Sequence, residues 1–256
     1  MKEFAQQIYR YFVDNITIPY FRMLMFQKLK AVQSIATGKL LDIGCGNQPY
    51  RKLFKNISQY IGTNSKEYYS KKTFSKLKTD YIVEDGCKLP FNDQEFDVVV
   101  NFQVLPVFKD PAAFIKEVKR VLRNQGIFII TTDFLYPIWN APNDYYRFTR
   151  YGLEQLVQRN NFDIVHLDNF GGYWSMRARI KEKYIKDMPA ILVNRILNRK
   201  KLSSKIFAMI LLILLIPCII LSPIYLNISF LIYHYLDKIF YNPDFTTNYI
   251  IILKKK

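Results

Sequence analysis

Short apolar runs recur along the chain, and helical or polar stretches separate them. Several runs are apolar at consecutive positions, as strands covered on both faces must be. The alternation of strands and helices predicts an α/β fold built on a Rossmann-like, doubly wound sheet. The strand candidates are Leu40–Ile43, Tyr60–Gly62, Tyr81–Val83, Val98–Asn101, Ile127–Thr132, Phe162–Leu167 and Tyr249–Leu253.

Helical signals fill the spaces between these runs. Asp110 is a good N-cap and Pro111 suits a first helical position, and apolar residues then recur at helical spacing as far as Leu122. A second helix is expected at about residues 151–159, with Thr149 near its cap. Residues 3–35 also have a helical pattern, so residues 1–37 are interpreted as an N-terminal helical cap.

A long apolar segment precedes the last strand. Residues 206–236 contain no Asp, Glu, Lys or Arg, and Pro217, Ser222 and Pro223 interrupt the segment near its middle. At ~1.5 Å per residue each arm spans about 17–20 Å, less than the ~30 Å of a bilayer core. The prediction is an apolar helical hairpin within residues 176–241, inserted into a Rossmann domain made of residues 38–175 and 242–256.

The charge of the chain is concentrated beside this apolar segment. The formal net charge is +16, and residues 177–205 alone hold ten Lys or Arg against Glu182 and Asp187. A basic region in this position fits anionic lipid headgroups better than nucleic acid. We therefore expect residues 206–236 and their basic flanks to contact membrane lipid from the cytoplasmic side, as a monotopic or peripheral protein. Burial of the hairpin within the protein or in an oligomer is the alternative.

A glycine turn follows the first strand, in the segment Leu-Asp-Ile-Gly-Cys-Gly at 41–46. Glycines there let the backbone approach a ligand closely. Five further segments accompany this turn: Pro-Tyr-Arg-Lys-Leu-Phe (49–54), Tyr-Ile-Gly (60–62), Asp-Gly-x-x-Leu-Pro-Phe (85–91), Phe-Asp-Val-Val (96–99) and Asp-Tyr-Tyr-Arg-Phe-Thr (144–149). In order and spacing, the chain resembles the class I S-adenosylmethionine-dependent methyltransferases, specifically the type-11 group, over roughly residues 38–170.

The resemblance implies a seven-stranded sheet with an antiparallel last strand and a set of residues around S-adenosylmethionine. Asp42, Gly44 and Gly46, with Cys45 between the glycines, would line the methionine end. Asp85 would accept the adenine amino group with Gly86 beside it, and Asn64 would stand where the family has an acid for the ribose. Asn101 and Phe102 would face the cofactor and the reaction space. No metal is expected.

Two departures from the family pattern concern catalysis. Asn64 cannot form the charge-assisted hydrogen bond of an acid, which is roughly twice as strong as a neutral one, so weaker cofactor binding is expected. The family segment Val-Leu-Glu-His-Val is here Val-Leu-Pro-Val-Phe at 104–108. Asp144 and Tyr145 are the remaining candidates for catalysis, with the alternative that Asp144 and Arg147 only hold a loop together.

These observations predict a methyltransferase that uses S-adenosylmethionine at the cytoplasmic membrane face, with a lipid-linked glycan, lipid or quinone-type acceptor. A non-catalytic, membrane-tethered binding protein of the same fold is the second hypothesis. Nucleic-acid modification is the third, and it fits the charge but not its position.

Overall fold

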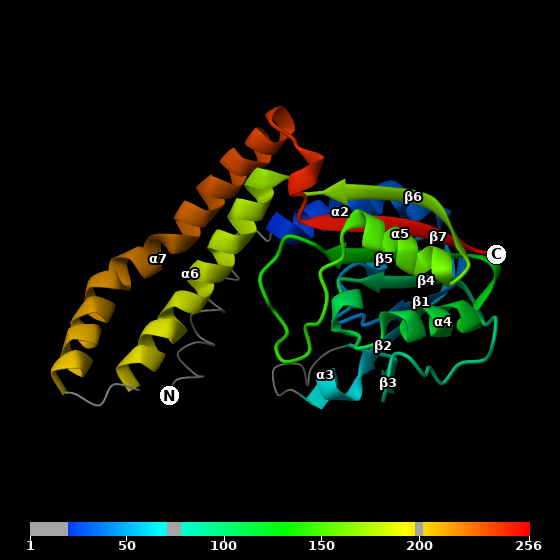
Figure 1. Cartoon of the computed structure of the whole chain (residues 1–256), viewed down its shortest axis with the longest axis horizontal. Coiled ribbons are helices and arrows are strands. Elements are labelled where there is room, and N and C mark those ends of the chain that lie inside the picture. The colour runs from blue at the N-terminus through cyan, green and yellow to red at the C-terminus, as the bar shows by residue number, and fades with distance from the viewer. Residues whose placement is uncertain (1–19, 71–77, 198–201) are drawn as a thin grey trace. The chain divides into compact units, whose positions relative to one another are not determined.

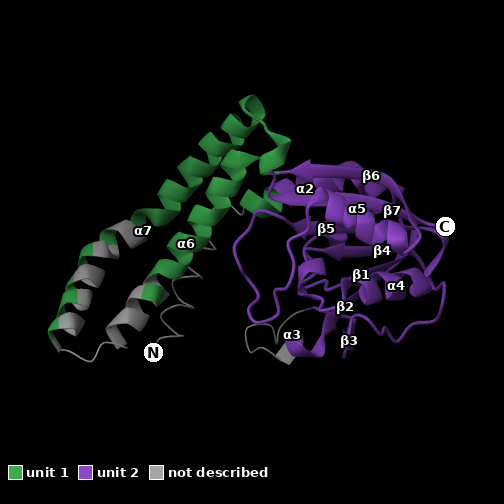
Figure 2. Cartoon of the chain, in the orientation of Figure 1, with its two compact units in different colours: residues 1–23, 171–245 green, residues 24–170, 246–256 purple. Residues whose placement is uncertain are grey.

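The computed structural model describes residues 20–70, 78–197 and 202–256. The chain divides into two compact units, which Figure 2 distinguishes by colour. Unit 1 comprises residues 1–23 and 171–245, and unit 2 comprises residues 24–170 and 246–256. Helix α2 (Tyr20–Val32) begins in unit 1 and ends in unit 2. The predicted helical segment before Tyr20 lies outside the described residues.

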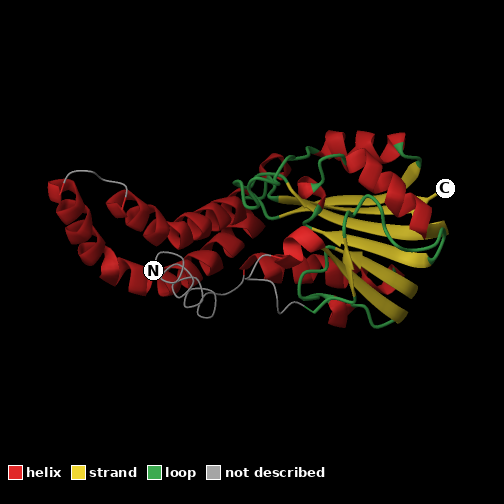
Figure 3. Ribbon diagram, turned by 90° about the horizontal axis from the view of Figure 1, so that it is seen from below, coloured by secondary structure: helices red, strands yellow, loops and turns green. Residues whose placement is uncertain are grey.

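Unit 2 is built on one seven-stranded sheet with the order β3-β2-β1-β4-β5-β7-β6, and Figure 3 shows its strands side by side. β7 is antiparallel to both of its neighbours, whereas the other pairs are parallel. This confirms the predicted Rossmann-like fold with an antiparallel last strand. The strands are β1 (Gly38–Ile43), β2 (Ile57–Ser65), β3 (Tyr81–Val83), β4 (Phe96–Phe102), β5 (Leu122–Asp133), β6 (Phe162–Phe170) and β7 (Asn248–Lys255).

Each predicted cap begins the expected helix. The Asp110 carboxylate accepts the Ala113 N–H at 2.9 Å at the start of α4 (Pro111–Val121). The Thr149 hydroxyl accepts the Gly152 N–H at 3.2 Å at the start of α5 (Arg150–Arg159). The shorter elements are α3 (Lys66–Ser70) and the 3-10 turns η1 (Gln33–Ile35), η2 (Arg51–Leu53), η4 (Leu105–Val107) and η5 (Pro243–Phe245).

The core of unit 2 lies between α4, α5 and one face of the sheet. Alternate residues of the central strands point to this face, and the same cluster contains the apolar stripes of both helices. Its fully buried members include Phe114, Val118, Phe128, Leu153 and Ile251.

Unit 1 contains two long helices, α6 (Tyr173–Leu197) and α7 (Leu202–Ile239), which lie side by side in Figure 1. The predicted turn at Pro217–Pro223 is wrong, because both prolines lie inside the continuous helix α7. A proline removes one backbone donor and crowds the preceding turn, and here the helix continues through both. The pairing of α6 with α7, and not a fold within 206–236, gives the unit its helical hairpin.

A buried carboxylate joins these two helices. Asp237 of α7 accepts backbone N–H groups from Gly172 (3.2 Å), Trp174 (2.9 Å) and Ser175 (2.8 Å) at the start of α6. It thereby caps the helix N-terminus, where backbone donors lack partners within the helix and negative charge is favourable. Within the described part of the chain, no helix combines the length and apolar character that crossing a bilayer requires.

Candidate functional site

The glycine loop begins at the carboxyl end of β1. Gly44 (φ 75°) and Gly46 (φ 54°) have left-handed backbone conformations, and the N–H groups of Gly44 and Cys45 donate to the Thr63 carbonyl at 2.8 and 3.0 Å. A Cβ atom on Gly44 would lie 2.6 Å from Val104 Cγ2, whereas one on Gly46 would meet only the Tyr68 hydroxyl, at 4.0 Å. Gly44 is therefore required by packing, and Gly46 leaves its backbone open to a ligand.

Asn64 at the end of β2 is bonded to this loop. Its Oδ1 accepts the Gly46 N–H at 2.9 Å, and its Nδ2 donates to the Gly46 carbonyl at 3.0 Å. The side chain is 1% exposed. An ionised carboxylate can only accept hydrogen bonds, so an acid at this position could not make the second bond. The geometry favours a brace for the glycine loop over the predicted weak ribose ligand.

Three polar atoms on neighbouring strands are buried without a hydrogen bond among the described residues. They are Asp42 Oδ1 on β1, Asn101 Oδ1 on β4 and Thr132 Oγ1 on β5. All three lie near the carboxyl ends of their strands, and β1 and β4 form the switch point where the strand order reverses. A buried polar atom without a partner costs about 1–3 kcal/mol. This edge therefore favours a ligand with hydrogen-bond donors.

The pKa of Asp42 is also shifted from its ordinary value. Burial raises the pKa of Asp42 to about 7, and a hydrogen bond from the Tyr60 hydroxyl to Oδ2 partly opposes that increase. The neighbouring Cys45 thiol is no nucleophile, since burial and the Asp42 charge raise its pKa to about 12. A cation placed beside Asp42 would favour the ionised carboxylate.

Asp85 and Gly86 lie in the turn after β3. Asp85 is exposed, and its Oδ1 accepts the Cys87 N–H at 2.8 Å. An exposed carboxylate can accept a hydrogen bond from an amine, and the predicted role at the adenine edge stays a prediction. Gly86 is buried against the Phe108 ring, with 2.6 Å between a Cβ placed on Gly86 and Phe108 Cε1. The close approach of this ring explains the need for glycine.

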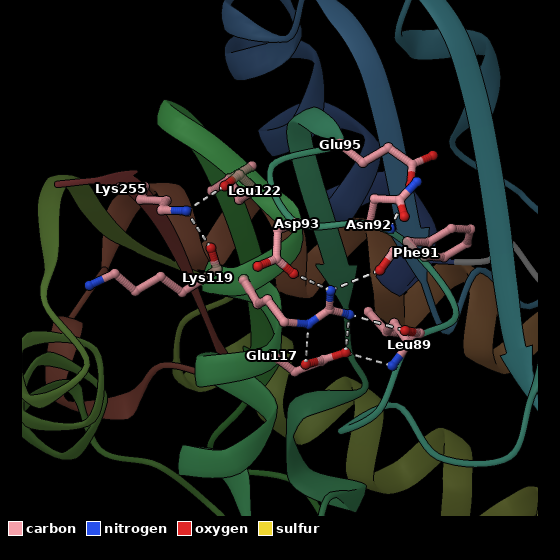
Figure 4. A network of polar contacts seen from close by, with 10 residues as sticks. Leu89, Phe91, Asn92, Asp93, Glu95, Glu117, Lys119, Leu122 and Lys255 are labelled. Carbon is pink, nitrogen blue, oxygen red and sulfur yellow. Dashed lines mark hydrogen bonds and ion pairs between the residues drawn. The ribbon is translucent and has the colours of Figure 1, made fainter.

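An ion pair on α4 fixes the segment that follows Gly86. Glu117 Oε1 accepts the Leu89 N–H at 2.6 Å, and Arg120 donates to the carbonyls of Leu89 (3.1 Å) and Phe91 (2.8 Å). Figure 4 shows Glu117 beside Leu89. Sequence reasoning missed this pair, because Glu and Arg three apart on a helix usually indicate only a solvated face. The pair holds the apolar segment that follows the predicted adenine residues Asp85 and Gly86.

Asn101 and Phe102 end β4 and point to opposite faces of the sheet. Asn101 Nδ2 donates to the Ile43 carbonyl at 2.9 Å, which ties the end of β4 to the start of the glycine loop. Phe102 is buried between the rings of Tyr50 and Phe54, at centroid distances of 5.6 and 6.2 Å. Asn101 Oδ1 is buried without a hydrogen-bond partner among the described residues, so it can accept a hydrogen bond from a ligand.

Comparisons with known proteins agree with this geometry. Residues 41–130 match the family model described as "Methyltransferase domain". The solved structure of the YcgJ protein from Bacillus subtilis superposes with a TM-score of 0.50 at 16% identity, covering 90% of this chain and 98% of that one, which shows the fold. Residues 41–130 are therefore similar to a methyltransferase domain, and the solved structure supports the same fold.

Two curated relatives are similar to part of this chain. The ubiquinone biosynthesis O-methyltransferase of Pelagibacter ubique is 32% identical over 105 residues, or 37% of this chain and 41% of that protein. The cycloartenol-C-24-methyltransferase 1 of Oryza sativa subsp. japonica is 31% identical over 101 residues, or 36% and 29%. The chain therefore spans about two fifths or less of the length of these two relatives.

The loop after β5 contains the two candidate catalytic residues. The side chain of Asp144 is 1% exposed, and both of its oxygens bond to the Arg147 guanidinium, at 2.5 and 2.9 Å. The Trp139 N–H donates to the same carboxylate at 2.8 Å. Burial opposes ionisation, but these bonds outweigh it and lower the pKa of Asp144. A carboxylate with such partners is a poor proton acceptor.

Other bonds attach this loop to the domain. Arg147 also donates to the carbonyls of Tyr136 (3.0 Å) and Pro137 (3.1 Å), and the Tyr145 N–H donates to the Pro106 carbonyl at 2.9 Å. The Tyr145 hydroxyl is exposed and donates to Asn143. The structure thus favours the loop-holding alternative for Asp144, while the catalytic role of Tyr145 stays a prediction.

A second buried acid at the same edge was missed by sequence reasoning. Asp133 ends β5, is 3% exposed, and accepts the Asn248 Nδ2 of β7 at 2.8 Å. No local signal distinguishes it, because the partner lies more than a hundred residues away. Neither histidine lies at this edge as a base: His166 is exposed on β6, and His234 of α7 packs edge-on against Tyr20 in unit 1.

Proposed function

We propose that this protein is a methyltransferase that uses S-adenosylmethionine. The observation that carries the proposal is the set of three buried, unpaired polar atoms on β1, β4 and β5, at the switch point beside an open glycine backbone. The hydrogen-bond donors of the cofactor fit these acceptors, because its ammonium group can donate to Asp42 and its exocyclic amine can donate to Asp85.

Different residues bind different parts of the cofactor and align it for the reaction. Gly46 allows close approach of the backbone, Asp42 binds the cationic methionine end, and Asp85 binds the adenine edge. Asn101 faces the cofactor from the other side of the sheet edge. The segment at Leu89, held by Glu117 and Arg120, packs against the ring. When bound, S-adenosylmethionine supplies a methyl group on a sulfonium centre. Alignment supplies much of the acceleration in such a displacement, so an acceptor that is already nucleophilic needs no strong base.

We propose an apolar acceptor at the cytoplasmic face of a membrane, such as a quinone, a lipid or a lipid-linked glycan. Two features support this proposal: the relatives named for ubiquinone biosynthesis and for cycloartenol methylation, and the exposed apolar residues of α7. Mass spectrometry of lipid extracts, comparing cells with and without the gene, tests the acceptor class. A methylated species lost only from the polar metabolite fraction would overturn it.

Titration calorimetry of the purified full chain with S-adenosylmethionine tests the cofactor. We expect saturable binding that Asp85→Asn weakens about tenfold, while Asp163→Asn, an exposed acid on β6, leaves it unchanged. Absence of binding by the wild-type protein would sink the proposal. The non-catalytic alternative rests on the pairing of Asp144 with Arg147, and it predicts binding of the cofactor with no methyl transfer to any lipid fraction.

A further inference from the structure

Helix α7 has two different faces over its described side chains. Ser222, Leu226 and Phe230 are buried, and Phe230 stacks on Tyr20 with 5.3 Å between ring centroids. One helical face is thereby used inside unit 1. At ~1.5 Å per residue the 38 residues of α7 extend roughly 57 Å, nearly twice the ~30 Å of a bilayer core.

The other face is an apolar stripe open to solvent. Six of its members follow one another at intervals of seven, three, four, three and four residues, which places them on one side of the helix. Each is more than half exposed: Leu214, Leu221, Ile224, Ile228, Leu231 and Tyr235. Soluble monomers rarely expose a continuous apolar patch of such length. We name these six residues the α7 stripe.

Positive charge borders the α7 stripe. Lys181 of α6 donates to the hydroxyls of Tyr225 (3.2 Å) and Tyr233 (3.1 Å), so its ammonium lies beside the helix that carries the stripe. Lys238 is exposed three residues after Tyr235, and Arg177 is exposed over the Trp174 ring at 5.5 Å. Lysine and arginine that lie over tyrosine and tryptophan rings are the residues favoured at a membrane–water interface.

The acidic side chains of α6 and α7 do not offset this charge. Glu182 pairs with Lys186 at 2.6 Å, and Asp187 pairs with Lys183 at 2.9 Å. Asp237 is buried as the cap of α6. The cations beside the stripe therefore remain available to negatively charged groups of a partner.

We propose that the α7 stripe docks on an anionic lipid surface, with α7 lying along the bilayer interface and not across it. Apolar side chains enter the boundary between headgroups and acyl chains, as in other interfacial helices, while Lys181, Lys238 and Arg177 bind lipid phosphates. The inference gives the membrane contact in the proposed function a defined surface. Its test requires no methyl transfer, so either conclusion can fail alone.

Vesicle flotation of the full-length chain tests this surface. We expect binding to vesicles of phosphatidylcholine mixed with phosphatidylglycerol, and much weaker binding to phosphatidylcholine alone. In 1 M salt, where the screening length falls to about 3 Å, the difference between the two compositions should disappear. Equal binding to both compositions at low salt would overturn the electrostatic part of the proposal.

The triple variant Ile224→Gln, Ile228→Gln and Leu231→Gln should lower vesicle binding roughly tenfold or more, because three exposed apolar side chains are lost from the interface. The matched control is Tyr151→Gln with Val165→Gln, two equally exposed apolar residues of unit 2, and it should bind vesicles like the wild type. Circular dichroism and cofactor calorimetry verify that both variants fold.

A second copy of the chain is the competing occupant. Sedimentation velocity in the absence of lipid distinguishes it: a wild-type dimer that becomes a monomer in the triple variant, with no vesicle binding by either protein, would overturn lipid docking. Vesicle binding by the wild-type protein that the triple variant loses would support it. Unchanged vesicle binding by a folded triple variant would show that lipid contacts another surface.

Discussion

The two units use apolar residues in opposite ways. In unit 2 the apolar positions of α4 and α5 are fully buried against the sheet, as Phe114 and Leu153 illustrate. In unit 1 the most apolar of the described helices, α7, exposes a face that includes Leu231 and Tyr235. An apolar run therefore predicts that a helix forms, but the number of neighbours in the fold determines which of its faces is buried.

The buried acids of the two units also differ in how many hydrogen bonds they accept. Asp237 of unit 1 accepts three backbone N–H groups, whereas Asp42 of unit 2 has an oxygen without a donor among the described residues. The first acid stabilises the pairing of two helices. In the proposed function the unpaired oxygen of the second acid accepts a hydrogen bond from the cofactor.

The largest effect should come from removing a buried ring of unit 2. Phe114→Ala leaves a cavity beneath the sheet and should lower the free energy of unfolding by about 3–5 kcal/mol. The exposed counterpart Leu231→Ala should change it by less than about 0.5 kcal/mol in lipid-free solution. Urea denaturation of the two variants gives the comparison, and similar losses would mean that the α7 stripe is covered in solution.

The unpaired acid should make stability depend on pH. The folded pKa of Asp42 is raised to about 7 from 3.8, so the folded chain retains this proton where the unfolded chain has lost it. The contribution of Asp42 to the free energy of unfolding is full below about pH 4 and is lost as pH rises through about 7. Its upper limit is about 4 kcal/mol. Denaturation midpoints measured across this range should fall for the wild type. Asp42→Asn should remove that slope, and an unchanged slope would assign the pH dependence to another group.

Asp237 should stabilise unit 1 through its three hydrogen bonds to backbone N–H groups. Asp237→Ala leaves the first backbone donors of α6 without a partner and should lower the stability of unit 1 by about 2 kcal/mol. Asp110→Ala removes a single capping bond in unit 2 and should cost about 1 kcal/mol. Hydrogen exchange at the start of α6 and of α4 follows each change separately. Faster exchange at both helices in either variant would contradict the assignment of each cap to its own unit.

The smallest effect is expected at Asn64, where the family pattern and the observed geometry predict opposite changes in cofactor affinity. By resemblance alone, Asn64→Asp restores a ribose acid and should tighten cofactor binding. In the structure it places a carboxylate against the Gly46 carbonyl, so we expect cofactor affinity to fall about three- to tenfold, with about 1 kcal/mol of stability lost. Calorimetry and thermal unfolding of this variant measure both quantities. Asn64→Ser keeps a hydrogen-bond donor, so its loss of affinity should be smaller. Tighter cofactor binding by the Asp variant would contradict the proposed role of Asn64 in bracing the glycine loop.

Sequence reasoning located the elements of unit 2 well. Strong local signals specify each of them: the Asp110 cap, the Thr149 cap, and the glycines at 44 and 46. Element ends were less accurate, since β2 starts at Ile57 and β5 at Leu122, before the apolar runs that indicated them. Backbone pairing with a neighbouring strand extends a strand beyond its apolar residues.

The positions of the candidate site residues were predicted in part, and their roles stay predictions. Asp42, Asp85, Gly86 and Asn101 lie at the carboxyl edge as expected, because the motif order fixes the loops in a doubly wound sheet. The roles of Asn64 and Asp144 depend on partners that only folding brings near: the Gly46 backbone for one, and the geometry of the Arg147 fork for the other. The Glu117–Arg120 pair and Asp133 gave no recognisable signal, since their contacts lie far away in the sequence.

The sequence by itself determined the class of sheet, the glycine turn and the location of positive charge beside the apolar segment, because these follow from local composition and spacing. Only the tertiary structure decided that α7 continues through Pro217 and Pro223, that one face of it is covered, and which buried polar atoms lack partners. Burial and hydrogen bonding are properties of neighbours in space, and a proline that ends an isolated helix is tolerated where packing along a partner helix offsets its lost bond.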